Sequence, residues 1–560
     1  QAYFPREAFF ATSATPPRSA LPAAPRCAKS PLPRAAMAGP RGREAPPERP
    51  EDYVDWALDH QVGTGRFQYV YILLLGSAYG FCSANTYAEV FVTMNGDKYL
   101  PPWSWHTDCG ADVSSCPVLS ASAAGDCRRV PLEQWAPDAH GRSIVADFKL
   151  ICSNGWKLPL LGSIYFAGFG AGLLVCGQIS DTLGRKRGYL FSAGCMAAGG
   201  ILAAASWSWA SYAVARAIVG FGVAGAGNTS FVWLTEYLNP ELRPVMAWFP
   251  NVAFCVAQAL PSALGVGIYG WRSFLLAVNL ISLSGLLYAP CMRESPRWLA
   301  MKGRHREAYE VVRRVAAANG VPEPPPPPQA QAHRAADEGA GAKGDGVRAV
   351  CAQLCSRRLG LRFLLMSFSW FSITFAFYGL GFFSPNLPFN AYAANAVNAV
   401  SSVPFYLVGQ PLIESRLCGR KGAVVGGFVL GGAGLLISTC IKSTVGSLLV
   451  YYAANGALCM AFGIIYVWSS ELFPTSMRGR VMSYLSLAGR VGAIVAPYVV
   501  KLGETRPAVA LALFAAPSLF SGAFDLLLPE TRGRRLPATF EEMPPAGRCS
   551  GGAAQALLGL

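Results

Sequence analysis

Apolar runs of similar length recur along the chain, and short polar stretches separate them. A helix needs about 20 apolar residues to cross a bilayer, and each run is close to that length. The remaining polar residues are too few to cover so many apolar helices in water. The pattern therefore predicts an all-α membrane protein with about twelve transmembrane helices, at residues 67–93, 158–179, 189–209, 212–234, 246–268, 272–291, 362–384, 391–412, 422–441, 447–468, 481–502 and 508–528.

Composition and charge placement agree with a membrane protein. Hydrophobic residues make up 52% of the chain and charged residues 14%, whereas a soluble domain has about 25% charged residues. The net charge of +15 would suit nucleic acid only if the basic residues formed one patch. They lie instead in short loops after alternate runs, at Arg185 to Arg187, Arg243, Arg293 to Arg314, Arg416 to Lys421, Arg478 with Arg480, and Arg532 to Arg535.

This alternation is the positive-inside pattern of membrane proteins. Loop 94–157 has six basic residues against seven acidic ones and is expected outside the cell. Both termini are then cytosolic, in a multi-pass protein of the plasma membrane. The expected partners are the lipid bilayer and a small solute, and no nucleic acid.

The chain also contains an internal repeat. Short motifs at the ends of corresponding runs recur at a nearly constant offset, which predicts two homologous six-helix halves. An even number of spans in each half makes the halves parallel repeats, with a substrate site expected between them near the midplane. The repeated positions are Gly184 with Gly419, Glu236 with Glu471 and Arg243 with Arg478, each 235 residues apart, and Glu294 with Glu530, 236 apart.

The repeat and the composition divide the chain into segments. Residues 1–52 are expected to be disordered, and the Ala/Pro/Arg-rich residues 1–36 are expected to lie upstream of a true start at Met37. The first half is then 53–298, including loop 94–157, and the second half is 362–535. The cytosolic linker 299–361 begins with a helical pattern and continues through a proline run, and 536–560 is a cytosolic tail.

Four cysteines in the outside loop predict two disulfides, because an oxidising compartment favours them. Three pairings are possible, and spacing does not choose among them. The four are Cys109, Cys116, Cys127 and Cys152. No metal site is expected, since Cys351 and Cys355 in the linker have too few companion ligands.

The motifs together resemble the major facilitator superfamily and, within it, the organic cation, anion and carnitine transporters (solute carrier family 22). They are FKLICSNGWK, GQISDTLGRKR, ESPRWL, ELFPTSMRGR, GRVGAIVAP and PETRG, and the resemblance covers about 53–540. It implies the major facilitator fold and transport by alternating access. No nucleotide-binding motif, metal cluster or catalytic dyad is present, so we expect neither an enzyme nor a cofactor.

Charged residues at the cytosolic helix ends are expected to form a conformational gate. The resemblance implies a latch in which Asp181 pairs with arginines across the interface between the halves. The alternative is that the basic residues only anchor the helices at the lipid headgroups. Arg416 takes the place where Asp181 would recur, with Glu414 two residues earlier. The gate residues are Asp181, Arg185, Lys186, Glu236, Arg243, Arg420, Glu471 and Arg478.

Arg490 lies in the middle of the apolar run 481–502. A charge at the bilayer centre costs at least about 2.5–3.5 kcal/mol, so an intramembrane arginine indicates a functional site. The alternative is an arginine satisfied by backbone carbonyls. No acidic residue is an obvious partner, and the resemblance implies that an arginine here accompanies anionic or zwitterionic substrates. Elsewhere, Arg216 either anchors a helix end or pairs with Glu89.

Aromatic residues on run 362–384 are candidates for the cavity wall. Trp370, Phe371 and Tyr378 either line the cavity or pack in the core, and Phe254, Gln258 and Tyr466 are further candidates of the same kind. We therefore expect a carrier of small organic ions, with carnitine-like or carboxylate substrates favoured over cations. Coupling to sodium or protons stays open, as do two alternatives: a sugar porter and a non-transporting receptor-like relative.

Overall fold

The structure is a computed structural model that describes most of the two predicted halves. The described residues are 47, 52–93, 105–107, 135–137, 143–150, 152–239, 241–242, 245–268, 270–327, 357–416, 418–474 and 478–533. Almost all of the N-terminal segment 1–52, the tail 536–560 and most of loop 94–157 lie outside these residues. The described residues belong to one compact unit, Gly39–Leu560.

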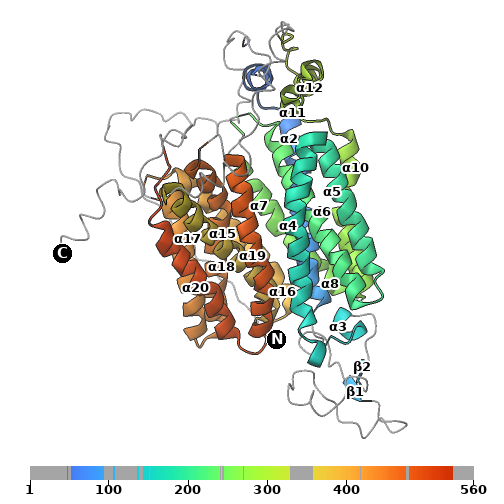
Figure 1. Ribbon diagram of the computed structural model, residues 1–560, viewed down its shortest axis with the longest axis vertical. Helices are drawn as coiled ribbons and strands as arrows, with labels where there is room; N and C mark the ends of the chain where they lie inside the picture. The colour runs from blue at the N-terminus through green and yellow to red at the C-terminus, as the bar shows by residue number, and fades with distance from the viewer. Residues whose placement is uncertain are drawn as a thin grey trace, which may run out of the picture. The chain divides into compact units, whose positions relative to one another are not determined.

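Helices of the first half stand beside helices of the second (Figure 1). The first half contains α1 (Tyr53–Trp56), the π-helix η1 (Ala57–Val62), α2 (Arg66–Val92), α3 (Ile144–Asp147), η6 (Cys152–Asn154), α4 (Lys157–Leu183), α5 (Arg185–Ala204), α6 (Trp209–Thr235), α7 (Val245–Gln258), α8 (Leu260–Gly267), α9 (Trp271–Ser282), α10 (Ser284–Tyr288) and η7 (Ala289–Cys291). The second half contains α15 (Arg357–Phe383), η8 (Ser384–Asn386), α16 (Ala391–Glu414), α17 (Gly419–Cys440), α18 (Thr444–Leu472), α19 (Arg478–Gly503) and α20 (Pro507–Asp525).

Eleven helices among the described residues are long and apolar enough to cross a bilayer. The predicted span at 189–209 is not one of them, because its helix α5 begins with the basic residues Arg185 to Arg187. Yet α5 packs along α6 and α9, as its repeat counterpart α17 packs along α18 and α20. With α5 included, the predicted pattern of twelve spans is confirmed.

The predicted span at 246–268 is broken rather than straight. It consists of α7 and α8, which meet at Ala259. Pro261 follows at the start of α8 and has no N–H for the helical ladder, so the ladder is interrupted before it.

The start of the predicted linker packs against one end of the first half. Helix α11 (Pro296–Met301) leads into it, and α12 (His305–Asn319) lies within it. The helical pattern predicted after residue 299 is thus confirmed. Asn319 accepts a hydrogen bond from the backbone N–H of Phe67 at 2.9 Å, and the Tyr53 hydroxyl donates to the Pro325 carbonyl at 2.6 Å. We call this side of the bundle the linker end.

The opposite side, which we call the loop end, carries α3 and a small antiparallel ladder. Strand β1 (Trp105–Thr107) pairs with β2 (Trp135–Pro137), with Trp105 opposite Pro137. Apart from this short ladder, the described residues confirm the predicted all-α fold. Cys109, Cys116, Cys127 and the side chain of Cys152 lie outside the described residues, so the disulfides stay a prediction.

Three hydrogen bonds that join the two halves lie toward the loop end. Ser163 of α4 donates to the Ile494 carbonyl of α19 at 2.6 Å. Asn395 of α16 donates to the Gln258 carbonyl at 3.1 Å and to Ser262 at 2.9 Å. These residues lie in the parts of their helices nearest the loop end, so the two halves are packed against each other on that side.

A buried ion pair holds the first half together. Arg216 of α6 and Glu89 of α2 are 2.8 Å apart, and each side chain is less than a tenth exposed. The Tyr212 hydroxyl donates to the same carboxylate at 3.0 Å, and the guanidinium donates to the Asn85 carbonyl at 3.3 Å and lies 4.7 Å from the Tyr165 ring. Of the two predicted roles for Arg216, the pairing with Glu89 is confirmed.

Glu89→Gln is expected to destabilise the protein strongly, because it leaves a buried cation without its counter-charge. Losing one partner of a buried pair costs about 3–5 kcal/mol. The melting temperature of the detergent-purified protein should fall well below that of the wild type. Glu504→Gln, which removes a half-exposed partner of Lys501, is the control and should change the melting temperature little. Equal melting temperatures for both variants would contradict this role of the pair.

Candidate functional site

Arg490 lies at the interface between the halves. Its helix α19 packs against α15 of the same half and α4 of the other. The side chain is only 5% exposed. Its Nη1 donates to the Tyr378 hydroxyl at 3.1 Å, and its guanidinium carbon is 4.0 Å from the ring centre of Phe169 on α4 and 5.7 Å from that of Tyr378. A single cation thus contacts aromatic rings from both halves.

The glycines that flank Arg490 allow this close packing. A Cβ on Gly492 would collide with the Phe371 carbonyl of α15. Thr374 of α15 donates a hydrogen bond to the Gly489 carbonyl. On the facing helix, a Cβ on Gly170 would lie 4.0 Å from the Arg490 Cβ. The sequence GRVG therefore brings the arginine to a position where three helices meet.

The charge of Arg490 has no acidic counterpart among the residues that the structure describes. Its Nε is buried and has no hydrogen-bond partner there. The hydroxyls of Tyr79 and Tyr466 lie near enough to interact electrostatically with the guanidinium. Aromatic faces attract a cation, but phenols and rings leave its charge uncompensated. The arrangement can therefore accept a carboxylate, the group that arginine binds bidentately.

The first half has no matching cation. Cys255 of α7 occupies the position 235 residues before Arg490, and it is 2% exposed. The arginine is therefore a feature of one half and is not imposed by the repeat.

The structure brings only some of the predicted aromatic residues to Arg490. Tyr378 contacts it directly, and Tyr466 lies beside it. Trp370 is fully buried, donates its Nε1–H to Ser469 at 2.9 Å and packs its ring 4.5 Å from that of Tyr466. Trp370 thus lies behind Tyr466. Phe371 stacks on Phe375 at 5.8 Å along its own helix and does not contact the guanidinium.

Phe254 and Gln258 lie on α7 and contact the other half. The Phe254 ring is 5.9 Å from that of Phe377. The backbone carbonyl of Gln258 accepts the hydrogen bond from the Asn395 side chain. Two neighbours of Arg490, Phe169 and Tyr79, were not predicted from the sequence. Each is an aromatic residue in the middle of a span, but the apolar surroundings of such residues do not indicate which way they face.

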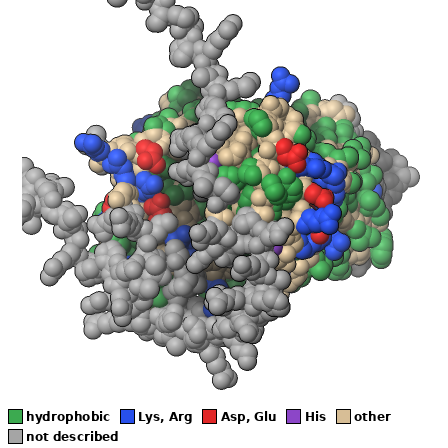
Figure 2. All heavy atoms as spheres, turned by 90° about the horizontal axis from the view of Figure 1, so that it is seen from above, with side chains coloured by type: hydrophobic (Ala, Val, Ile, Leu, Met, Phe, Trp, Pro, Cys, Tyr) green, Lys and Arg blue, Asp and Glu red, His purple; other side chains and the backbone are tan. Residues whose placement is uncertain are grey.

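At the linker end, the predicted gate residues form the same network twice. Arg185 donates to Glu236 at 2.8 Å, and Arg420 lies 3.2 Å from Glu471. Each arginine begins a helix at the same position of its half. Basic and acidic side chains gather in two separate groups on this face (Figure 2).

Two carboxylates that the sequence analysis gave no role complete these networks. Glu294 accepts hydrogen bonds from the backbone N–H groups of Arg185 and Lys186, at 2.8 and 3.2 Å. Glu530 does the same for Arg420 and Lys421, at 3.1 and 2.9 Å. Each caps a helix start, where an anion is favoured. Their shared offset in ESPR and PETR was the signal that could have identified them.

The glycine before each arginine makes room for the capping carboxylate. Gly184 and Gly419 have φ angles of +108° and +64°, which residues with a Cβ rarely adopt. A Cβ at either position would collide with Glu294 or Glu530. Burial raises the pKa of the Glu294 carboxyl above its ordinary value, although the backbone donors oppose this shift.

Asp181 has its partner within its own half in this state, so its predicted pairing across the interface stays a prediction. Its carboxylate pairs with Arg185 in its own half rather than with an arginine across the interface, and its side chain is 71% exposed. In the second half Glu414 takes this role, 3.6 Å from Arg420. The bundle is closed at the loop end, so the charged helix ends have partners within their own halves. Lys186 donates to the Pro290 carbonyl at 2.6 Å, Arg243 lies outside the described residues, and Arg478 begins α19.

Comparisons with known proteins agree with this arrangement. The family model described as "Sugar (and other) transporter" matches residues 144–544. The chain is 31% identical over 408 residues to an organic cation transporter protein of Drosophila melanogaster, covering 71% of this chain and 74% of the relative. It is 29% identical over 502 residues to organic cation/carnitine transporter 4 of Arabidopsis thaliana, covering 86% and 89%.

A third relative, solute carrier family 22 member 6 of Danio rerio, is 27% identical over 528 residues, covering 88% of this chain and 94% of the relative. Among solved structures, the xylose transporter XylE from E. coli in an inward open conformation has a TM-score of 0.55 at 16% identity, covering 83% of this chain and 97% of that one. This last likeness concerns the fold. The chain belongs to the major facilitator superfamily and, within it, to solute carrier family 22, the organic cation, anion and carnitine transporters.

Proposed function

We propose that the protein carries small organic anions or zwitterions across the plasma membrane by alternating access, and that Arg490 binds their carboxylate. The observation that supports this most is the buried guanidinium without an acidic partner among the described residues. Its Nη1 donates to the Tyr378 hydroxyl, and its buried Nε–H has no hydrogen-bond partner among the described residues. A substrate carboxylate supplies the missing charge and accepts the remaining N–H groups.

The aromatic residues around Arg490 support a substrate of drug-like or carnitine-like size. Tyr378, Tyr466, Tyr79 and Phe169 present ring faces and hydroxyls beside a single cation. Apolar contact with the rings binds the organic part of the substrate, and the guanidinium fixes the carboxylate end. A zwitterion suits this site because its cationic group can lie against a ring face.

The charged networks at the linker end act as the gate. Arg185 has two acidic partners, Glu236 and the exposed Asp181, so one of the two can exchange partners without leaving the arginine unpaired. When the halves rock and the linker end closes, Asp181 pairs with a basic residue of the other half. Several such pairs are needed, because one exposed pair contributes only about 0–1 kcal/mol.

The orientation follows from the charge distribution. The linker end faces the cytosol and the loop end, with its predicted disulfides, faces outward, so this state is closed to the outside. By the same charge pattern, both termini are cytosolic. The uptake measurements described below test whether transport is coupled to sodium or to protons.

Two other functions have some support. The match to a sugar transporter model and the likeness to a xylose transporter favour a sugar porter, although a buried arginine without an acid suits a carboxylate better than a neutral sugar. Arg416 stands where the repeat would place an acid, which favours a receptor-like relative with an altered gate. A receptor would bind the solute without accumulating it in cells.

Arg490→Ala is expected to reduce uptake of carboxylate substrates by about ten- to a hundredfold, since a hydrogen bond to a charged group is worth about 1.5–3 kcal/mol. Arg490→Lys keeps the charge but loses the bidentate geometry. Its uptake of carboxylates should therefore lie between that of the wild type and that of Arg490→Ala. Uptake is measured per surface-expressed molecule, with labelled carboxylates and their neutral amides as paired substrates. Uptake of the neutral amides should be the same for the wild type and both variants.

Arg506→Ala, which removes an exposed arginine at the start of α20, is the control for surface expression and should transport like the wild type. Wild-type uptake of the carboxylates by both Arg490 variants would contradict the proposed binding role.

Asp181→Asn is expected to slow uptake while surface expression and melting temperature stay near wild type, because Glu236 still pairs with Arg185. Arg187→Gln, at an exposed position of the same helix start, serves as the matched charge control. If both variants transport at the wild-type rate, Asp181 has no part in the gate.

A panel of carnitine-like zwitterions, organic anions, organic cations and hexoses separates the three functions. Uptake is compared with and without sodium and at two pH values. We expect accumulation of zwitterions or anions. Accumulation of hexoses alone would indicate a sugar porter, and saturable binding without accumulation would indicate a receptor.

A further inference from the structure

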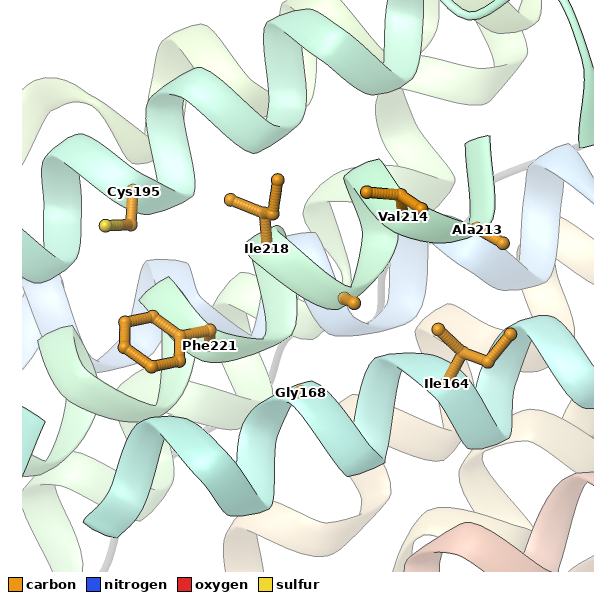
Figure 3. A pocket seen from close by; sticks show the side chains of 8 residues that line it. Ile164, Gly168, Cys195, Ala213, Val214, Ile218 and Phe221 are labelled. Carbon is orange, nitrogen blue, oxygen red and sulfur yellow. The ribbon is translucent and has the colours of Figure 1, made fainter. Parts of the chain in front are cut away.

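An apolar groove lies between α4 and α6, away from Arg490. Its volume is about 510 Å³. Figure 3 shows Ile164 and Gly168 on one helix opposite side chains of α6, with Cys195 of α5 at one end. No charged side chain or amide lines it. The lining residues are Ile164, Gly168, Cys195, Ala213, Val214, Ala217, Ile218 and Phe221.

The helices α4 and α6 touch where Gly168 and Ala217 line the groove. A Cβ on Gly168 would collide with the Ala217 backbone carbonyl. At the 235-residue offset the lining residues differ in both directions: Gly168, Ala213 and Ala217 become Val403, Leu448 and Tyr452, whereas Ile164, Ile218 and Phe221 become Ala399, Ala453 and Gly456. The set of side chains that lines the groove is therefore specific to this half.

The depth of the groove matches a single leaflet. Eight residues of α6 separate Ala213 from Phe221, the first and last residues of that helix that line the groove. At 1.5 Å per residue this is about 12 Å, compared with about 15 Å for half of the hydrocarbon core. Phe221 lies near the middle of α6, so the groove extends from there toward the loop end over a length that one leaflet covers.

A cation lies above the groove on the same face of α4. Lys157 precedes Ile164 and Gly168 by seven and eleven residues, so the three share one side of the helix. Its Nζ is 5.8 Å from the ring centre of Trp209 and 6.0 Å from that of Trp156. The Trp209 Nε1–H donates to the Lys157 carbonyl at 3.4 Å. Within the described residues, no carboxylate lies at ion-pair distance from this ammonium.

We propose that the groove binds a phospholipid of the leaflet at the loop end, with one acyl chain between α4 and α6 and its phosphate on Lys157. Apolar walls of one-leaflet depth suit the chain, and the ammonium between two tryptophans, a residue type enriched at headgroup level, complements the phosphate. The lipid lies against α4, whose inner face contacts Arg490 through Phe169. The proposal concerns lipid binding alone and does not depend on the substrate.

The test is native mass spectrometry of the purified full-length protein, delipidated and then titrated with palmitoyl-oleoyl phosphatidylglycerol. The wild type should retain one lipid at low added concentration. Ala217→Phe fills the groove and Lys157→Gln removes the cation, and each should lose this bound lipid. Ala453→Phe, on the exposed face of α18, and Lys442→Gln, at an exposed loop, are matched controls and should retain it.

Palmitoyl-oleoyl glycerol has the same chains and no phosphate. It should bind the wild type more weakly than phosphatidylglycerol does, and it should bind the wild type and Lys157→Gln equally. Equal retention of phosphatidylglycerol by the wild type and both variants would overturn the proposal. So would a loss of dimer mass in Ala217→Phe without a change in lipid, because the groove would then be an interface between two copies. Melting temperatures of all variants check that each is folded.

Discussion

A charge inside the hydrocarbon layer needs a partner, and this constraint organises the protein. Each half meets it differently. Glu89 and Arg216 neutralise each other within the first half, so that pair is structural. Among the described residues, Arg490 is surrounded by tyrosine hydroxyls, aromatic rings and helix packing, without an acidic partner. An intramembrane cation whose counter-charge is not supplied by the described protein is best explained by a ligand that supplies it, and this explanation links the fold to the proposed carboxylate substrate.

The repeat explains why function is concentrated at the few positions where the halves differ. The capped arginines, Arg185 with Glu294 and Arg420 with Glu530, are duplicated and hold the helix starts together in both halves. Arg490, by contrast, has Cys255 as its counterpart in the repeat. On the proposed function, the duplicated features maintain the moving parts and Arg490 gives the protein its specificity.

The sequence predicted the architecture well because span length and repeat offset are simple physical signals. The offset also identified the residues of the duplicated networks, although the role of Glu294 and Glu530 as helix caps was recognised only in the structure. Contacts between helices could not be predicted: spans that are apolar on all sides do not indicate which face is inward. Phe169 was therefore missed, and the sequence left open whether Trp370 lines the cavity or packs in the core; in the structure its ring packs on that of Tyr466. The partner of Asp181 depends on which end of the bundle is closed, and the sequence encodes both states.

The most direct test of the central claim is an experimental structure of the protein with a transported carboxylate bound. The account predicts that the carboxylate lies within hydrogen-bond distance of the Arg490 guanidinium, with the organic part of the ligand against Tyr378 and Tyr466. A ligand bound elsewhere, with Arg490 still donating only to Tyr378, would contradict it.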